Sequence, residues 1–227
     1  MYALMRWVMR AITRGYLVGD LFEVTGAEQV PRSGALLVCS NHISTIDPPL
    51  LPAFLPRADT WSMGKSEYFE RPFVSWVFRR YHAFPVVRHT ADRRALRRGL
   101  QVLAAGGALI LYPEGTRIAS GGMVRPEPGA GFLAQYSRAP ILPVALSGTR
   151  ECFPKGARWP RRTRVAVRFG RPFRLADAHE DGSRVRHQEA ADAIMLAVAE
   201  LAPPELRGEF ADLDGLRMRL GGLYRPA

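Results

Sequence analysis

A histidine and an aspartate lie five residues apart in the segment S-N-H-I-S-T-I-D-P-P, residues 40–49. A histidine side chain titrates near neutral pH, so it can take a proton from an alcohol. It does so better when a carboxylate fixes its tautomer and stabilises the protonated ring. Five residues do not place two side chains on one face of a helix, so a turn must bring His42 and Asp47 together. We interpret the pair as a candidate general base with its orienting carboxylate.

The polar residues of this segment also have other interpretations. A lone histidine such as His42 is more often a structural or surface residue. Asp47 precedes two prolines, a pattern typical of a helix start with Asp as N-cap and Pro at the first helical position. The two roles of Asp47 are compatible, since one oxygen can cap a helix while the other binds His42. Ser44 raises the alternative of a serine hydrolase, but the G-x-S-x-G elbow is absent and Ser44 lies two residues from His42. We therefore expect the His–Asp pair to act directly on an acceptor hydroxyl.

A second polar motif follows an apolar run in L-I-L-Y-P-E-G-T-R, residues 109–117. Gly115 permits close backbone approach, Thr116 offers a hydroxyl, and Arg117 offers a forked cation suited to phosphate. The alternative is an ordinary strand-to-turn junction with a surface Glu–Arg pair. No Walker or dinucleotide glycine pattern accompanies the motif, which disfavours nucleotide binding.

Short apolar runs alternate with helical periodicity along the chain. Runs typical of strands occupy 34–40, 59–64, 83–87, 107–113, 139–148 and 164–170, and helical spacing occupies 71–81, 91–107 and 183–201. This order predicts an α/β fold with a mixed, mainly parallel β-sheet flanked by helices. Ligands of such sheets gather at the carboxyl ends of strands, where both polar motifs lie. We expect one domain over 25–227, with its core at about 25–175.

The cysteine content, the net charge and the hydrophobic pattern limit the kinds of function that the protein can have. The two cysteines, Cys39 and Cys152, are far apart in the sequence and indicate a reducing compartment rather than a disulfide framework. A net charge of +11 implies a polyanionic neighbour, which is nucleic acid, anionic lipid or a phosphorylated substrate. A nucleic-acid-binding module is the alternative from another class, suggested by the arginines of 91–105, but interleaved aromatics and known binding motifs are lacking. The sequence contains no run of 18 apolar residues, so it predicts no transmembrane helix.

The amino-terminal segment 1–24 predicts an amphipathic helix. Arg6, Arg10 and Arg14 recur every four residues and form one stripe, beside Trp7 and several aliphatic residues. Such a helix suits an anionic membrane interface. The alternative is a helix packed on the domain, with its arginines facing water.

The two motifs together resemble those of a known family. N-H-I-S-T-I-D (41–47) followed by Y-P-E-G-T-R (112–117) is similar to the glycerolipid acyltransferases, in particular the 1-acyl-sn-glycerol-3-phosphate (lysophosphatidic acid) acyltransferase branch. Three further blocks resemble the family in order: M-G-K-S-E-Y-F (63–69), F-P-V-V-R (84–88) and A-P-I-L-P-V-A-L-S-G (139–148). The resemblance covers about 25–175. It departs at Glu127-Pro128, where the family often carries a lysine before the glycine that opens a helix near 129.

The resemblance implies a reaction and a role for each residue. His42 is expected to be the general base, oriented by Asp47, for transfer of a fatty acyl chain from acyl-CoA or acyl-carrier protein. The expected acceptor is the free sn-2 hydroxyl of 1-acylglycerol 3-phosphate, and the product is phosphatidic acid for phospholipid synthesis. The acceptor's phosphate and glycerol are expected to bind Arg88, Glu114, Gly115, Thr116 and Arg117, with Ser44 and Lys65 as further pocket members.

The resemblance also bears on partners and location. It implies no metal and no cofactor besides the acyl donor, and it favours an anionic membrane surface over nucleic acid as the partner of the basic chain. The expected location is the cytoplasmic face of the cell membrane, as a peripheral protein. Two alternatives remain: an acyltransferase acting on a different lysolipid, and a thioesterase or hydrolase that uses the same His–Asp pair with water.

Overall fold

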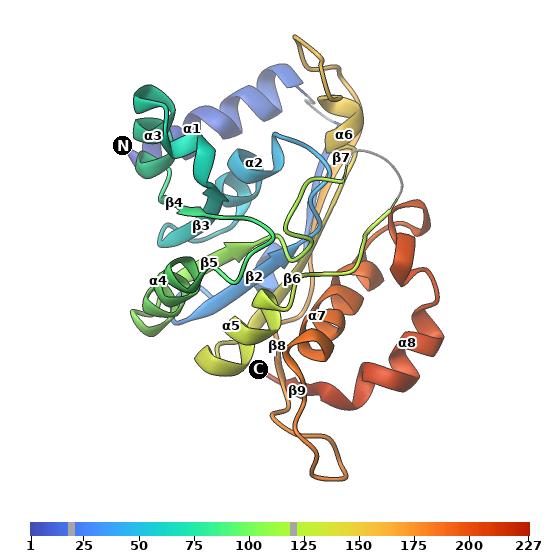
Figure 1. Ribbon diagram of the computed structural model, residues 1–227. Coiled ribbons are helices and arrows are strands. Elements are labelled where there is room, and N and C mark those ends of the chain that lie inside the picture. Colours follow the sequence, from blue (N-terminus) through green and yellow to red (C-terminus); the bar gives the residue numbers. More distant parts are fainter. Residues whose placement is uncertain (18–20, 119–121) are drawn as a thin grey trace.

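A mixed β-sheet with helices on both faces makes up the protein (Figure 1), whose computed structural model describes residues 1–17, 21–118 and 122–227. The strands are β1 (Phe22–Thr25), β2 (Leu36–Ser40), β3 (Thr60–Lys65), β4 (Ala83–Val86), β5 (Ala108–Leu111), β6 (Ile141–Ser147), β7 (Val165–Phe169), β8 (Phe173–Leu175) and β9 (Tyr224–Pro226). Their order is β1-β7-β6-β2-β5-β3-β4, with β8 pairing with β6 and β9. Five pairings are parallel and those of β6 with β7, β6 with β8 and β8 with β9 are antiparallel. The predicted fold class is confirmed.

The helices fill the connections between the strands. They are α1 (Tyr2–Ile12), α2 (Asp47–Phe54), α3 (Pro72–Arg80), α4 (Arg93–Ala104), α5 (Gly129–Ser137), α6 (Thr149–Cys152), α7 (His187–Leu201) and α8 (Leu213–Leu220). The six predicted strands correspond to β2 through β7, and the three predicted helices to α3, α4 and α7. The sequence did not predict β1, β8 or β9, which are three or four residues long and lie at or near the sheet's edge.

Strand β2 lies at the centre of the sheet, between β5 and β6, and all five of its residues are buried. Successive side chains point to opposite faces of a strand. Leu36 and Val38 therefore join the core under α2, whereas Leu37 and Cys39 join the core under α4 and α5. Burial on both faces is typical of a parallel sheet covered by helices. The His–Asp segment thus leaves the most enclosed strand of the fold.

Helix α7 adds a third cluster of buried side chains on the same side of the sheet as α5. Its residues Met195 and Val198 pack with Phe210, Leu220 and Leu223 from the carboxyl-terminal segment. Buried side chains therefore continue beyond residue 175 to the carboxyl-terminal segment.

Helix α1 differs from both expectations for its arginines. Arg6 is buried and donates to the carbonyl of Leu55, and Arg10 donates to the carbonyl of Ala53. These carbonyls lie at the carboxyl-terminal end of α2, where helix carbonyls lack internal partners and cations are favoured. Arg6 and Arg10 thus bond to the domain, whereas Arg14 is exposed and its guanidinium lies over the ring of Phe54. Trp7 is 66% exposed. The predicted segment 1–24 also includes 18–20, which lie outside the described residues. No helix in the described ranges is long and apolar enough to cross a membrane.

Close packing of α5 on α7 makes a first prediction. A Cβ added at Gly131 of α5 would lie 1.9 Å from the carbonyl oxygen of His187. We expect Gly131→Ala to lower the free energy of unfolding by about 1–3 kcal/mol, because backbone must shift to admit the methyl group. Urea denaturation measures this change. Gly129→Ala in the same helix is the matched control, since its Cβ would meet only a Leu96 methyl at 3.7 Å. Equal stability of the two variants would contradict the prediction.

Candidate active site

One oxygen of Asp47 holds the segment that carries His42. Oδ2 lies 2.9 Å from His42 Nδ1 and accepts hydrogen bonds from the backbone amides of Ile43 at 2.8 Å and Ser44 at 2.7 Å. Asp47 is fully buried, and its Oδ1 has no hydrogen-bond partner among the residues described. With Nδ1 engaged, Nε2 is the ring nitrogen of His42 left for a substrate. The turn required by the sequence is therefore built around a single carboxylate.

Asp47 does not cap the helix that it begins. Helix α2 has Ile46 at its N-cap position and no side-chain capping bond. A capping carboxylate accepts from the amide of the second or third helical residue. Pro49 has no amide hydrogen to donate, and the amide of Leu50 donates to the carbonyl of Ile46 at 2.9 Å instead. The carboxylate of Asp47 turns back toward His42 instead. The capping interpretation of Asp47 was wrong, for this reason.

The second motif reaches the first through the backbone of His42. Strand β5 lies parallel to β2, so both motifs leave the same edge of the sheet. Glu114 Oε2 accepts from the amide of His42 at 2.8 Å, and the amide of Ile118 donates to the carbonyl of His42 at 2.8 Å. Gly115 has a φ of 67°, a left-handed conformation that glycine adopts without strain. The turn after β5 therefore wraps around His42.

Glu114 is a buried carboxyl group with an altered pKa. Burial raises its pKa to about 7, and the nearby Asp47 adds to this effect, whereas the amides of His42 and Val124 oppose it. The carboxylate points at these two amides, with Val124 N at 3.4 Å. Glu114 is thus placed to position the His42 segment.

Two neighbours of His42 fix its surroundings. The ring of Tyr112 stacks on the imidazole with ring centroids 4.4 Å apart. Burial raises the pKa of Tyr112 well above its ordinary value, so the phenol stays neutral. Asn41 bonds through its side chain to both the amide and the carbonyl of Leu146, at 2.8 and 2.9 Å. These contacts close one face of the imidazole and tie the segment to β6.

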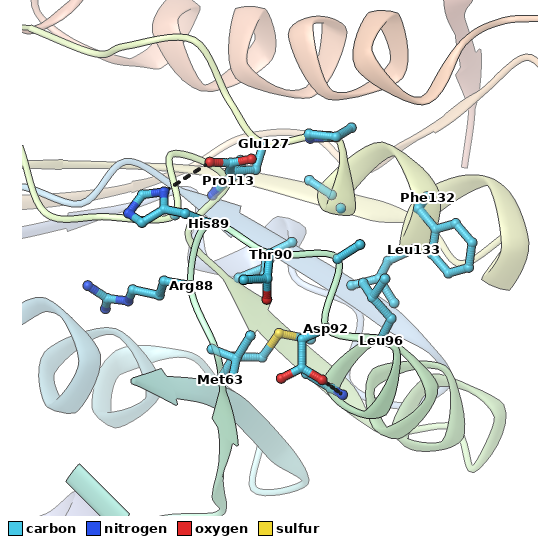
Figure 2. Close-up of a pocket in the computed structure, with 18 of the residues that line it drawn as sticks. Met63, Arg88, His89, Thr90, Asp92, Leu96, Pro113, Glu127, Phe132 and Leu133 are labelled. Atoms are coloured by element: carbon cyan, nitrogen blue, oxygen red, sulfur yellow. Dashed lines mark hydrogen bonds and ion pairs between the residues drawn. The ribbon is translucent and has the colours of Figure 1, made fainter. Parts of the chain in front are cut away.

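A cavity of about 400 Å³ opens beside His42 (Figure 2). Its apolar wall comes from β3, β5, α4 and α5, and includes Met63, Leu96, Leu111, Phe132 and Leu133. Figure 2 shows Arg88, His89 and Glu127 at one end and Leu96, Leu133 and Phe132 at the other. His89 Nδ1 lies 3.2 Å from Glu127 Oε1. The cavity therefore combines a charged end with an apolar end, as a site for an amphipathic molecule requires.

The structure divides the predicted site residues into two groups. His42, Arg88 and Gly115 line the cavity, and Asp47 and Glu114 lie behind His42. The remaining four are absent from the cavity wall: Ser44, Lys65, Thr116 and Arg117. Ser44 donates its hydroxyl to the carbonyl of Phe153 at 3.3 Å, and Lys65 pairs with Glu67 at 2.7 Å.

Sequence reasoning missed several residues of the site. The stacking of Tyr112 on His42 and the His89–Glu127 pair are visible only once the strands are placed. Glu127 had one signal in the sequence, since it stands where the resembling family often carries lysine. The apolar wall had none, because its residues come from four separate elements.

Comparison with known proteins gives the class to which this fold and site belong. The sequence model of the Acyltransferase family matches residues 21–147, more than half of the chain, and the chain belongs to this family.

Particular relatives share one name. A 1-acyl-sn-glycerol-3-phosphate acyltransferase of Limnanthes alba is 27% identical over 165 residues, which are 71% of this chain and 58% of that protein. One of Pseudomonas aeruginosa is 25% identical over 207 residues, 88% of this chain and 76% of that protein. The crystal structure of PlsC, the 1-acyl-sn-glycerophosphate acyltransferase of Thermotoga maritima, has a TM-score of 0.63 at 27% identity, covering 74% of this chain and 67% of that one. The chain spans only 40% of a chloroplastic relative in Brassica napus.

The pKa of Glu114 makes a second prediction. Its proton is held more tightly in the folded state, where the pKa is about 7, than at the ordinary value of 4.5. Stability should therefore fall as pH rises through this window, with this group contributing a slope of up to about 1.4 kcal/mol per pH unit. We expect Glu114→Gln to remove that contribution, as measured by urea unfolding at a series of pH values. Glu205→Gln, at an exposed carboxylate, should keep the wild-type slope. An unchanged slope in Glu114→Gln would show that another group is responsible.

Proposed function

We propose that the protein transfers a fatty acyl chain from acyl-CoA or acyl-carrier protein to the sn-2 hydroxyl of 1-acylglycerol 3-phosphate. The product is phosphatidic acid, for phospholipid synthesis. The observation that carries this proposal is the His42 imidazole, bonded at Nδ1 to buried Asp47 and bordering a cavity with one charged and one apolar end. The shared name of the relatives from Limnanthes alba and Pseudomonas aeruginosa supports the choice of acceptor.

The proposed reaction is one direct transfer. Nε2 of His42 takes the proton of the acceptor hydroxyl as the oxygen attacks the thioester carbonyl carbon. The negative charge of Asp47 stabilises the imidazolium that forms. The carbon–sulfur bond then breaks, and the imidazolium returns the proton to the thiolate that leaves. No acyl-enzyme is formed, in keeping with the hydroxyl of Ser44 being engaged by the carbonyl of Phe153. The scheme requires no metal and no cofactor besides the donor.

The cavity offers a place for each part of the substrates. Arg88 borders it at the charged end, and a guanidinium can bind phosphate through two hydrogen bonds. Gly115 lines the same cavity. Thr116 and Arg117 are proposed as further phosphate ligands because they follow Gly115 on the turn, although neither lines the cavity. The apolar wall suits an acyl chain. Lys65 does not line the cavity, and its ammonium pairs with Glu67.

Glu114 acts in this proposal through His42 rather than on the acceptor. Its two oxygens face the amides of His42 and Val124, and a carboxylate so placed is a poor ligand for a phosphate. We assign it the role of a positioning residue.

The proposed location is the cytoplasmic face of the cell membrane, with the protein bound peripherally. Helix α1 supports it, because its exposed side carries large apolar residues: Met1, Leu4, Trp7, Val8 and Ile12. A helix with an exposed apolar side and a Trp suits the membrane interface. The net charge of +11 favours an anionic surface.

Two alternative functions use the same pair of His42 and Asp47, which is called the dyad from here on. A thioesterase would activate water in place of the lipid hydroxyl, but it would leave Arg88 without a role at the cavity. An acyltransferase acting on a different lysolipid would be consistent with Glu127, which adds a negative charge near the proposed phosphate site. Thiol release from acyl-CoA that does not depend on lysophosphatidic acid would favour the thioesterase. Lipid mass spectrometry of the products from a panel of lysolipids identifies the acceptor.

The dyad makes a third prediction. We expect His42→Ala and Asp47→Asn to reduce the rate of acyl transfer by on the order of 10² to 10⁴-fold, the usual contribution of a positioned general base. Circular dichroism should show both variants folded. Transfer is followed by thiol release together with formation of phosphatidic acid. Full activity of Asp47→Asn with a lowered melting temperature would mean that Asp47 only supports the fold.

Arg88 makes a fourth prediction. Loss of a charge-assisted hydrogen bond to phosphate should lower kcat/KM for lysophosphatidic acid by on the order of 10 to 100-fold in Arg88→Gln, mostly through KM. A monoacylglycerol, which lacks the phosphate, should be used equally by the variant and the wild type. Arg219→Gln removes the same charge from the exposed surface of α8 and is the control. An equal loss on both acceptors would argue against a phosphate contact.

A further inference from the structure

The connection between α6 and β7, residues 153–164, is a basic and exposed loop. This loop carries five cations and no acid: Lys155, Arg158, Arg161, Arg162 and Arg164. All five are exposed. At its tip, Trp159 is 76% exposed, the largest exposure of any Trp in the described chain. A single exposed apolar side chain is ordinary on a protein surface, so Trp159 is informative here only together with the five cations around it.

The loop is anchored at the candidate active site. Its first residue, Phe153, accepts the hydroxyl hydrogen bond of Ser44, whose amide is in turn bound by Asp47. The amide of Arg161 donates to the carbonyl of Cys152 at 2.7 Å and closes the loop at its base. The tip therefore projects from a fixed base beside the dyad. Figure 1 shows the loop leaving α6 and projecting at the top of the view, where the carboxyl-terminal end of α1 also lies.

We propose that the 153–164 loop docks on an anionic phospholipid bilayer, with Trp159 at the level of the headgroups and its arginines against the lipid phosphates. The inference rests on the membrane location in the proposed function and adds to α1 a second contact. Tryptophan concentrates at the membrane–water interface, and basic residues beside it are attracted by anionic lipid. Two contacts on one rigid body strengthen each other, because the second forms without a further loss of translational freedom. Together they set which side of the protein faces the lipid.

Three kinds of partner could bind an exposed Trp that is surrounded by cations. Single-stranded nucleic acid also stacks on exposed Trp and binds arginine, and an acidic carrier protein would also be attracted. The bilayer is favoured because α1 carries an exposed Trp and aliphatic residues, while Arg6 and Arg10 bond to the carbonyls of Leu55 and Ala53. Those two cations are thus engaged by the domain, and the loop supplies further cationic charge to the same membrane contact.

The test is co-sedimentation of the full chain with vesicles of phosphatidylcholine alone and of phosphatidylcholine mixed equally with phosphatidylglycerol. Each basic residue near an anionic surface contributes about fivefold to partitioning, so Arg158→Gln/Arg161→Gln should lower binding to the anionic vesicles by on the order of 20-fold. Trp159→Ala should lower it several-fold. High salt should weaken wild-type binding more than that of the double variant.

A matched control separates the loop from net charge. Arg184→Gln/Arg219→Gln also removes two exposed cations, on the 177–186 segment and α8, and should change partitioning by less than about twofold. Melting temperatures should be equal in all variants. An equal loss in the control, or wild-type partitioning of both loop variants, would overturn the proposal.

Two further measurements exclude the other partners and separate this proposal from the proposed function. Loop variants that bind vesicles normally but lose transfer only with acyl-carrier protein would make the loop a carrier-protein site and overturn the bilayer proposal. A mobility shift with single-stranded DNA that the loop variants abolish, without an effect on vesicle binding, would likewise overturn it. Vesicle binding is measured without turnover. Absence of acyl transfer in the wild-type protein would therefore count against the proposed function and not against the loop.

Discussion

The hydrogen bond from the His42 amide to Glu114 depends on the register of two neighbouring strands. In the β2–β5 pair, Cys39 lies opposite Leu111, and continuing that register brings His42 opposite Glu114. Both groups are buried, so each would cost free energy without its partner. Asp47 then holds the imidazole from within the same turn. The ring of His42 cannot be displaced without breaking contacts that come from two strands, and its orientation is therefore a property of the sheet.

The sequence was sufficient to predict His42 and Asp47 as a pair, the central strands and the edge at which both motifs lie. Its limits have physical causes. Helical periodicity predicted that Arg6 and Arg10 share a stripe, but it does not say whether that stripe meets water or the end of another helix. The burial of Glu114 depends on β2 and β5 being neighbours, although they are far apart in the chain. Strands as short as β8 and β9 show no periodicity to detect.

Arginine serves two opposite purposes in this protein. In α1, Arg6 and Arg10 donate to backbone carbonyls at the end of α2, and Arg6 is buried there. In the 153–164 loop it is exposed around Trp159. A net charge of +11 therefore overstates the charge available to an outside partner, because arginines such as Arg6 bond within the fold.

Helix α2 connects the amino terminus to the dyad, since it begins at Asp47 and ends at the carbonyls that Arg6 and Arg10 bind. Tyr2 adds a bond to Thr60, at the first residue of β3. Shortening the chain to remove the apolar α1 is an obvious way to improve handling in the laboratory. That shortening would also remove the partners of the carbonyls at the far end of α2. A preparation lacking α1 would therefore test a weakened scaffold together with the loss of the proposed membrane contact. Point changes on the outer side of α1 avoid this confusion.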